Sequence, residues 1–413
     1  MNKLLYKSAT GIATASLLAQ AFLPIAFADT TIEISGNGAN SNNEASVEIK
    51  NETQVVQNNF AEIQNQVSVS ANTGGNDANN NTGGDVSIDT GNATSNTTIN
   101  NTANANVANV SGCCPGDVDV KISGNGADSK NEAKVKTETK TNLVQNNVAE
   151  VANFVQAKLN TGKNDANNNT GGDVDIDTGN AKANVTLSTK VNKNVAKVGG
   201  NNGGSLSLEI SGNGANSNNE AKAELKSDTN VVQNNFADIL NDVWVKANTG
   251  KNDANNNTGG DVSIDTGNAE VDVEVNNLAN FNWADVDACG CILDASIKIK
   301  GNGFNSKNEA KLKLEVKKLI VQNNVFDCKK FEDACALVWV KANTGKNDAN
   351  NNTGGVDDPG IETGNAGADV EVNNAANQNV VGDVSLGDIV LPPFDFTGGS
   401  FSGLLLLLIG LFS

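Results

Sequence analysis

Apolar and polar residues alternate along much of this chain. In Val271-Asp-Val-Glu-Val275 the valines share one side and the acids the other, and Leu312-Lys-Leu-Glu-Val316 has the same pattern. A period of two is that of a β-strand with one buried face. After the N-terminal segment, no long stretch has the period of an amphipathic helix. The pattern therefore predicts an all-β protein.

Polar turns rich in glycine and asparagine follow the alternating stretches. Ser35-Gly-Asn-Gly-Ala39 ends one of them, and Asp89-Thr-Gly-Asn-Ala93 ends another. Glycine adopts positive φ without strain, and asparagine tolerates it best among the other residues. Counted from turn to turn, the strand–turn units are about 15 to 22 residues long.

The chain is also an internal repeat. Ser35-Gly-Asn-Gly recurs at Ser123 and Ser211, with a variant at Lys300, so the spacings are 88, 88 and 89 residues. We therefore divide the chain into a leader (1–28), four repeats (29–118, 119–206, 207–295 and 296–385) and a C-terminal linker with a hydrophobic tail (386–413).

Repetition of this kind predicts a β-solenoid, in which equivalent units stack over a shared core. Because about four strand–turn units fit into each repeat, we expect about four coils per repeat and a rod roughly 80 Å long at strand spacing. Identical amides stacked about 4.8 Å apart can each donate to one neighbour and accept from the other. The expected ladder positions are Asn37, Gln57, Asn59, Asn76 and Asn92.

Two other folds are compatible with the pattern. Four separate β-sandwich domains of one repeat each are feasible, but aromatic residues make up only 4% of the chain, which argues against a thick core. Disorder is the second alternative, because tracts rich in Asn, Gly and Thr often fail to fold. The regular Val and Ile positions argue against it.

One segment carries a family resemblance. Gln57-Asn-Asn-Phe-Ala-Glu-Ile-Gln64, with copies at Gln145 and Gln233, resembles the curlin repeat of bacterial surface amyloid. The resemblance implies a laddered solenoid and, beyond that, self-assembly into fibres. The sequence departs from the family in two ways: Asn58 stands where the family has glycine, and only one unit in four has the paired glutamines.

The N-terminus predicts export. Lys3 and Lys7 precede a mostly apolar run, and Ala26-Phe-Ala28 places small residues where signal peptidase reads them. We expect cleavage before Asp29, with a retained N-terminal membrane anchor as the alternative. The protein is therefore expected to be extracellular or at the cell surface.

Composition argues against several functions. The chain has 48 acidic residues against 29 basic ones, a net charge of −19, and no histidine. All the basic residues are lysines, and an acidic chain without arginine suits nucleic acid poorly. Without imidazole, the usual catalytic triads and zinc sites cannot form. We therefore expect no enzymatic activity.

The six cysteines favour disulfide bonds, because their number is even and the chain is expected in an oxidising compartment. Those in the links between repeats would be separated by about eight coils, so each link is expected to form local bonds. The other two flank an insertion in the fourth repeat, which a bond between them would close. Metal binding is the alternative. The candidates are Cys113, Cys114, Cys289, Cys291, Cys328 and Cys335.

Oxygen-rich turns make calcium an open alternative, although no cofactor is expected. The candidate ligands are Asp165, Asp173, Asp175 and Asp177. Calcium takes six to eight oxygens, but the spacing of these residues misses that of an EF-hand. Strand alternation and amide ladders explain the same residues without an ion.

The C-terminus departs from the repeat. Leu391-Pro-Pro-Phe-Asp-Phe-Thr-Gly-Gly399 is followed by an apolar run from Gly403 to Phe412 that is too short to span a membrane comfortably. It is similar to a wall-sorting tail, although no basic residue follows Phe412. The tail predicts attachment to a membrane or wall, or a cap on the solenoid end.

These features predict a non-catalytic, exported cell-surface protein, structural or adhesive, that contacts other surface components or itself. The alternatives are a self-assembling extracellular fibre subunit of the curlin type and a calcium-stabilised surface-layer component.

Overall fold

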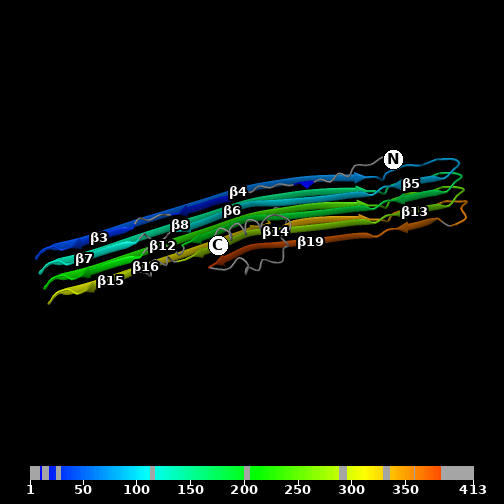
Figure 1. Ribbon diagram of the computed structural model, residues 1–413. Coiled ribbons are helices and arrows are strands. Elements are labelled where there is room, and N and C mark those ends of the chain that lie inside the picture. Colours follow the sequence, from blue (N-terminus) through cyan, green and yellow to red (C-terminus); the bar gives the residue numbers. More distant parts are fainter. Residues whose placement is uncertain are drawn as a thin grey trace.

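The computed structural model describes residues 10–11, 18–24, 29–111, 117–199, 205–287, 295–328, 335–357 and 359–382. Within these ranges every regular element is a β-strand, and the strands form four sheets. All pairs between the long strands are parallel. The prediction of an all-β solenoid is therefore confirmed (Figure 1).

Each repeat forms one coil of the solenoid, which we call a rung. Rung 1 contains β3 (Thr30–Ser35), β4 (Asn42–Asn72), β5 (Val86–Thr90) and β6 (Ala93–Ser111). Rung 2 contains β7 (Val118–Ser123), β8 (Lys130–Asn160), β9 (Val174–Thr178) and β10 (Ala181–Val198), and rung 3 contains β11 (Leu206–Ser211), β12 (Asn218–Asn248), β13 (Val262–Thr266) and β14 (Ala269–Val286). Rung 4 contains β15 (Ala295–Lys300), β16 (Lys307–Asp327), β17 (Ala336–Asn343), β18 (Gly360–Thr363) and β19 (Ala366–Val381).

Every rung pairs with the equivalent positions of the next rung. Val47 lies opposite Val135, Val135 opposite Ala223, and Ala223 opposite Leu312. The expectation of about four coils per repeat was therefore wrong, since one repeat makes one coil. Stacking repeat on repeat matches identical side chains at most positions, whereas stacking the shorter units within a repeat would place unlike residues together.

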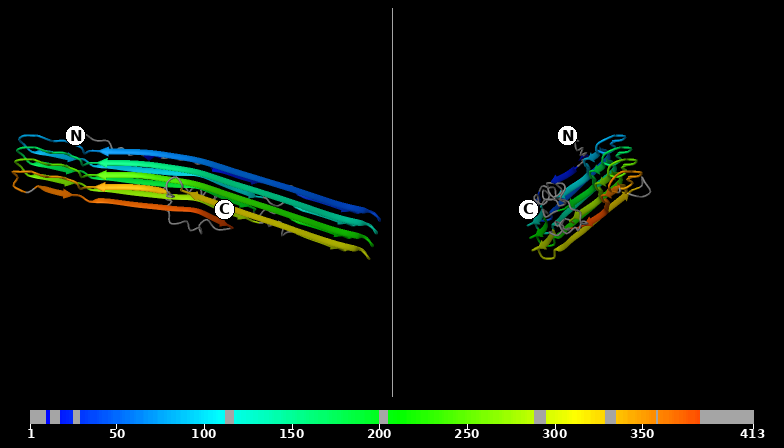
Figure 2. Two further views of the ribbon diagram at one scale, coloured as in Figure 1. Left: turned by 180° about the vertical axis from the view of Figure 1, so that it is seen from behind. Right: turned by 90° about the vertical axis from the view of Figure 1, so that its right-hand side faces the viewer.

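The wide coil changes the shape of the molecule. A 31-residue strand such as β4 is about 100 Å long, whereas four rungs at strand spacing occupy only roughly 20 Å. The expected rod of roughly 80 Å along the solenoid axis was therefore wrong. Figure 2 shows the long strands running along the molecule, with the rungs stacked in chain order across it.

The core is a thin layer between two opposed sets of strands. Val243 and Val245 of β12 pack in one cluster with Val271 and Val273 of β14. In another cluster the start of the long strand packs on the short first strand, as Val135 does with Val120 and Ile122. The alternating pattern of the sequence thus places Val, Ile, Leu and Ala inside and charges outside.

The second long strand contains a bulge in every rung. The bulged residue has positive φ and is Asn104, Asn192, Asn280 or Asn377, with φ of 60°, 64°, 61° and 63°. Strand pairing skips this residue, because Val191 pairs with Ala103 and Lys193 with Ala105. Asparagine suits the position because it tolerates left-handed backbone geometry.

Two short strands at the N-terminus pair with the outer edge of β6. These are β1 (Thr10–Gly11) and β2 (Leu18–Pro24), and both run parallel to β6. They lie inside the predicted signal peptide at residues 1–28. The outer edge of β6 therefore accepts an additional parallel strand.

The close stacking of rungs requires glycine in the turns. A Cβ built on Gly162 would lie 2.1 Å from the carbonyl oxygen of Gly250, whereas a Cβ on Gly345 in rung 4 has nothing within 4 Å. We expect Gly162→Ala to lower the free energy of unfolding by about 1–3 kcal/mol or more through overpacking. Gly345→Ala, in the same turn of the last rung, should leave the monomer nearly unchanged. Urea titration of both variants checks this, and equal losses would contradict it.

Candidate functional site

A network of asparagines, buried in rungs 1 to 3, connects the two layers through all four rungs. Asn59 Nδ2 donates to Asn106 Oδ1 across the core at 2.8 Å, and Asn106 Nδ2 donates to Asn147 Oδ1 of the next rung at 2.9 Å. The same zigzag continues through Asn194, Asn235, Asn282, Asn324 and Asn379. Asn147 is 1% exposed and Asn194 is fully buried. Each interior amide therefore has both a donor and an acceptor, which offsets its desolvation.

The predicted ladder residues lie in separate ladders, each connecting equivalent positions of successive rungs. Gln145 Nε2 donates to Gln57 Oε1 at 2.7 Å, and Asn59 Nδ2 donates to Asn147 Oδ1 at 3.1 Å. Asn76 Nδ2 donates to Asn164 Oδ1 at 3.0 Å.

The other two predicted positions bond through backbone N–H groups. The N–H of Asn37 donates to Asn125 Oδ1 at 3.1 Å, and the N–H of Asn180 donates to Asn92 Oδ1 at 2.7 Å. Asn92 is exposed, so its ladder lies on the surface.

Sequence reasoning missed the asparagines of the opposite layer. Asn106 recurs as Asn194, Asn282 and Asn379, and these positions complete the zigzag network. They follow the bulge and have no Gly-Asn turn beside them, so the turn pattern does not select them. Their recurrence in all four repeats was the signal that could have found them.

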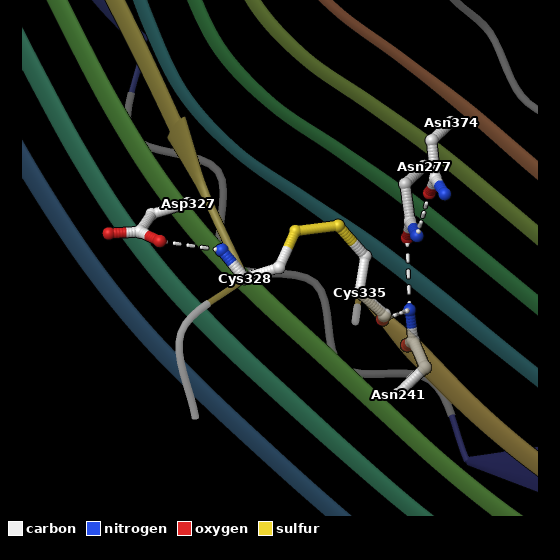
Figure 3. Close-up of a disulfide and its surroundings, with 6 residues drawn as sticks. All are labelled: Asn241, Asn277, Asp327, Cys328, Cys335 and Asn374. Atoms are coloured by element: carbon white, nitrogen blue, oxygen red, sulfur yellow. Dashed lines mark hydrogen bonds between the residues drawn. A yellow bond between two sulfur atoms is a disulfide. The ribbon is translucent and has the colours of Figure 1, made fainter. Parts of the chain in front are cut away.

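A further ladder ends at a disulfide in rung 4 (Figure 3). In it Asn65 Nδ2 donates to Asn153 Oδ1 at 2.8 Å, and Asn153 Nδ2 donates to Asn241 Oδ1 at 2.7 Å. Asn241 Nδ2 donates to the carbonyl oxygen of Cys335 at 3.3 Å and to Asn277 Oδ1 at 3.2 Å. Cys335 is bonded to Cys328, with 4.8 Å between their Cα atoms. A backbone carbonyl thus replaces the fourth amide, where the insertion interrupts the strand between β16 and β17.

The other four cysteines, Cys113, Cys114, Cys289 and Cys291, lie outside the described residues. The links that contain them follow rungs 1 and 3. Those rungs are two strand spacings apart, about 10 Å. The expected separation by eight coils was therefore wrong, because each repeat contributes one coil.

The stack has two open edges. We call the outer side of β3, β4, β5 and β6 the rung 1 edge, and the outer side of β15, β16, β17, β18 and β19 the rung 4 edge. In the part of the chain that the structure describes, only β1 and β2 pair with either edge. Both edges therefore present long rows of unpaired backbone N–H and C=O groups.

Buried acceptors at the rung 1 edge lack the donor that interior rungs supply. Asn59 Oδ1 and Asn104 Oδ1 are buried and accept no hydrogen bond within the described residues. In rung 2, the equivalent oxygens of Asn147 and Asn192 accept from the amides of the rung above at 3.1 and 3.0 Å. An unsatisfied buried acceptor costs about 1–3 kcal/mol, so this edge favours a donor from another rung.

Acidic residues also stack in columns. Asp165 lies between Asp77 and Asp253 in the turn after the long strands, and Asp348 follows in rung 4. Burial and the neighbouring Asp253 and Asp77 carboxylates raise the pKa of Asp165. Burial and then Asp265 and Asp89 raise the pKa of Asp177. Asp175 and Asp173 instead accept hydrogen bonds from the next rung, from the Ser263 hydroxyl and the Asp261 N–H.

The four predicted calcium ligands thus each stack on the equivalent positions of adjacent rungs. Among the described residues, no group of three or more His, Cys, Asp or Glu side chains is arranged to hold a metal ion. Within the same residues, no helix has the length and apolar content needed to cross a bilayer.

Removing one amide from the buried network should be costly. Asn147 donates to Asn194 and Asn235 and accepts from Asn59 and Asn106. We expect Asn147→Ala to lower the free energy of unfolding by about 2–4 kcal/mol, because several buried polar groups lose their partner. The neighbouring Asn146, which bonds Asn58 on the outer face, is the matched control. Asn146→Ala should cost less than about 1 kcal/mol, and equal losses in denaturant titration would argue against the buried network.

Removing the central charge of the acidic column should give a pH-dependent gain. The folded-state pKa of Asp165 is raised, so protonation stabilises the fold below the unfolded-state pKa, and this contribution is lost as pH rises through the folded-state pKa. Asp165→Asn removes the repulsion. We expect a higher Tm than wild type at pH 7 and little difference near pH 3, measured by thermal unfolding. The same gain at both pH values would contradict the electrostatic cause.

Comparisons of the chain with protein-family models, curated proteins and solved structures give no match. The resemblance of Gln57 to Gln64 to the curlin repeat therefore stays a prediction.

Proposed function

We propose that this protein is a non-catalytic extracellular structural subunit that stacks head to tail, rung 4 edge on rung 1 edge, into a fibre. The observation that carries the proposal is the complementarity of the two edges. Rung 1 presents buried acceptors without donors, and rung 4 ends the same ladders on their donor side.

The hydrogen bonds at such a junction would repeat those inside the molecule. Asn235 Nδ2 donates to Asn324 Oδ1 at 2.9 Å, and Asn280 Nδ2 donates to Asn377 Oδ1 at 3.0 Å. In a stacked pair, Asn324 and Asn377 would donate in turn to Asn59 and Asn104 of the next copy. The glutamine ladder runs in the opposite direction, so Gln57 of the next copy would donate to Gln322.

Apolar area also favours stacking. Leu312, Leu314 and Val316 of the rung 4 edge are 47%, 46% and 48% exposed, although they stand in register with inward-facing positions. Their rung 3 equivalents Ala223 and Leu225 are 3% and 5% exposed. These side chains are exposed because no rung lies beneath them within the described chain, and a further rung would cover them.

The size of the interface supports a stable contact. A rung paired along its full length would form roughly fifty backbone hydrogen bonds in the parallel pattern. At about 0.5–1.5 kcal/mol net for each bond, the gain exceeds the roughly 4–15 kcal/mol that association costs in lost rigid-body freedom. Because the two edges differ, the contact is heterologous and does not close on itself, so it extends into a filament.

The predicted processing fits this assembly. β1 and β2 occupy part of the β6 edge and lie within residues 1–28, which signal peptidase is predicted to remove. Removal would leave the rung 1 edge open along its whole length. Attachment through the tail at residues 386–413, and contact with other surface components, stay predictions, because the tail lies outside the described residues.

Two glycines allow assembly to be blocked without disturbing the monomer. A Cβ on Gly345 or on Gly38 has nothing within 4 Å, although a Cβ on their equivalents Gly250 and Gly126 would lie 2.1 and 2.4 Å from backbone of the adjacent rung. We expect Gly345→Ala and Gly38→Ala to fold normally from Asp29 onward but to form no filaments, because each methyl group would meet the backbone of the next copy.

Gly367→Ala is the matched control. Gly367 also has nothing within 4 Å, but it pairs with Glu270 and so occupies a position that bears a side chain in rung 3. This variant should assemble as wild type does. Negative-stain electron microscopy and sedimentation would measure filament mass. Wild type that stays monomeric, or filaments from both edge variants, would overturn the proposed function.

A further inference from the structure

Three outward-facing columns on the long strands alternate in charge from rung to rung. The first is Glu48, Lys136, Glu224 and Lys313 in rungs 1 to 4. The second is Lys50, Glu138, Lys226 and Glu315, and the third is Glu52, Lys140, Asp228 and Lys317. On the opposite layer, Glu33, Lys121, Glu209 and Lys298 alternate in the same way.

Opposite charges meet across the rungs. Lys136 Nζ lies 3.3 Å from Glu48 Oε1, and Lys313 Nζ lies 2.7 Å from Glu224 Oε1. They also meet along a strand, since Lys50 Nζ lies 3.0 Å from the same Glu48 oxygen. The charges therefore form a checkerboard on the outer face.

The number of rungs is even, so the alternation of charge can continue from rung 4 of one copy into rung 1 of the next. Each column that begins with one sign in rung 1 ends with the other sign in rung 4. If rung 4 is placed on rung 1 of a second copy in the same register, Lys313 meets Glu48, Glu315 meets Lys50, and Lys317 meets Glu52. Each contact then has the signs of the internal contacts.

We propose that this checkerboard sets the register of the junction between copies, so that the partner of the rung 4 edge is the rung 1 edge of a second copy aligned to the residue. The inference rests on the proposed function, because it assumes that copies stack. A slip of one residue would expose the apolar face and is excluded by burial. A slip of two residues keeps the faces but places Lys313 against Lys50 and Glu315 against Glu52.

The charges act on register more than on affinity. Exposed ion pairs contribute little individually, and β4 could form nearly as many backbone hydrogen bonds with β16 after a slip of two residues. The bulge at Asn104 and the turns match only without the slip, and the charges favour the same register. Like charges directly opposite each other are unfavourable in a sheet. The slip opposes like charges in two columns and places Lys317 against the neutral Gln54, so the matched register is favoured.

Two charge-swapped variants of the chain from Asp29 onward test the proposal. The rung 1 swap is Glu48→Lys, Lys50→Glu and Glu52→Lys, and the rung 4 swap is Lys313→Glu, Glu315→Lys and Lys317→Glu. Each swap opposes like charges at the junction between copies. It also does so inside the molecule, between rungs 1 and 2 for the rung 1 swap and between rungs 3 and 4 for the rung 4 swap. Alone at low salt, each variant should assemble with a critical concentration raised about tenfold or more.

Matched charges at the junction, and with them assembly, should be restored in two ways. An equimolar mixture of the two swaps can form alternating filaments, because each swapped edge fits the other and the unswapped edges still match. A variant with both swaps should assemble alone, although it has two mismatched internal contacts and is therefore the least stable monomer. Recovery in this variant excludes misfolding as the cause of the single-swap defect.

Sedimentation and electron microscopy give the outcomes, with circular dichroism to verify the β-structure of each variant. Single swaps that fail, with recovery in the mixture and in the doubly swapped variant, support the proposal. Single swaps that assemble like wild type overturn the register proposal and leave the fibre proposal intact. Failure of both the mixture and the doubly swapped variant to assemble has the same two consequences. Wild type that forms no filaments overturns both proposals together.

Discussion

The fold depends on the in-register stacking of nearly identical rungs at the spacing of paired β-strands. At about 4.8 Å between rungs, each turn or inward-facing position has room only for a side chain that fits those directly above and below. This is why glycine is needed at Gly162, where a Cβ would lie 2.1 Å from a carbonyl oxygen of the next rung. Changes in repeat length leave the pairing in register: paired residues of rungs 3 and 4 are 89 residues apart in β16, 95 in β17 and 97 in β19.

Stacking also explains how a core can contain so many amides. A buried amide in an ordinary core seldom finds partners for all its donors and acceptors, but the zigzag network provides them in both interior rungs. The solution fails at the first rung, where Asn59 and Asn104 retain buried acceptors without donors. The interaction that stabilises the interior therefore makes the ends prone to further stacking, which is how we connect the fold to a fibre.

The sequence was sufficient to predict strands, turns, the repeat and ladders that start at residues such as Gln57 and Asn59. It was not sufficient to predict the length of the coil, because alternation shows which residues face inward but not which strands pair. The 88-residue spacing was the informative feature, since only repeat-on-repeat stacking aligns the recurring amides and inward-facing positions along whole strands. The opposite half of the zigzag network was missed because Asn106 follows a bulge at Asn104, a local change of phase that a period of two does not reveal.

Rung 4 differs from the other rungs in ways that bear on how its edge can pair. Lys318 occupies the position of Thr141 and Thr229, which are 2% and 7% exposed, and its ammonium donates to the carbonyl oxygen of Val286. A charged side chain at an inward-facing edge position discourages pairing with unrelated strands, because an unmatched partner would have to bury it. With apolar attraction weakened in this way, selection of a partner depends more on matched amides and charges. The rung 1 edge of a second copy supplies both.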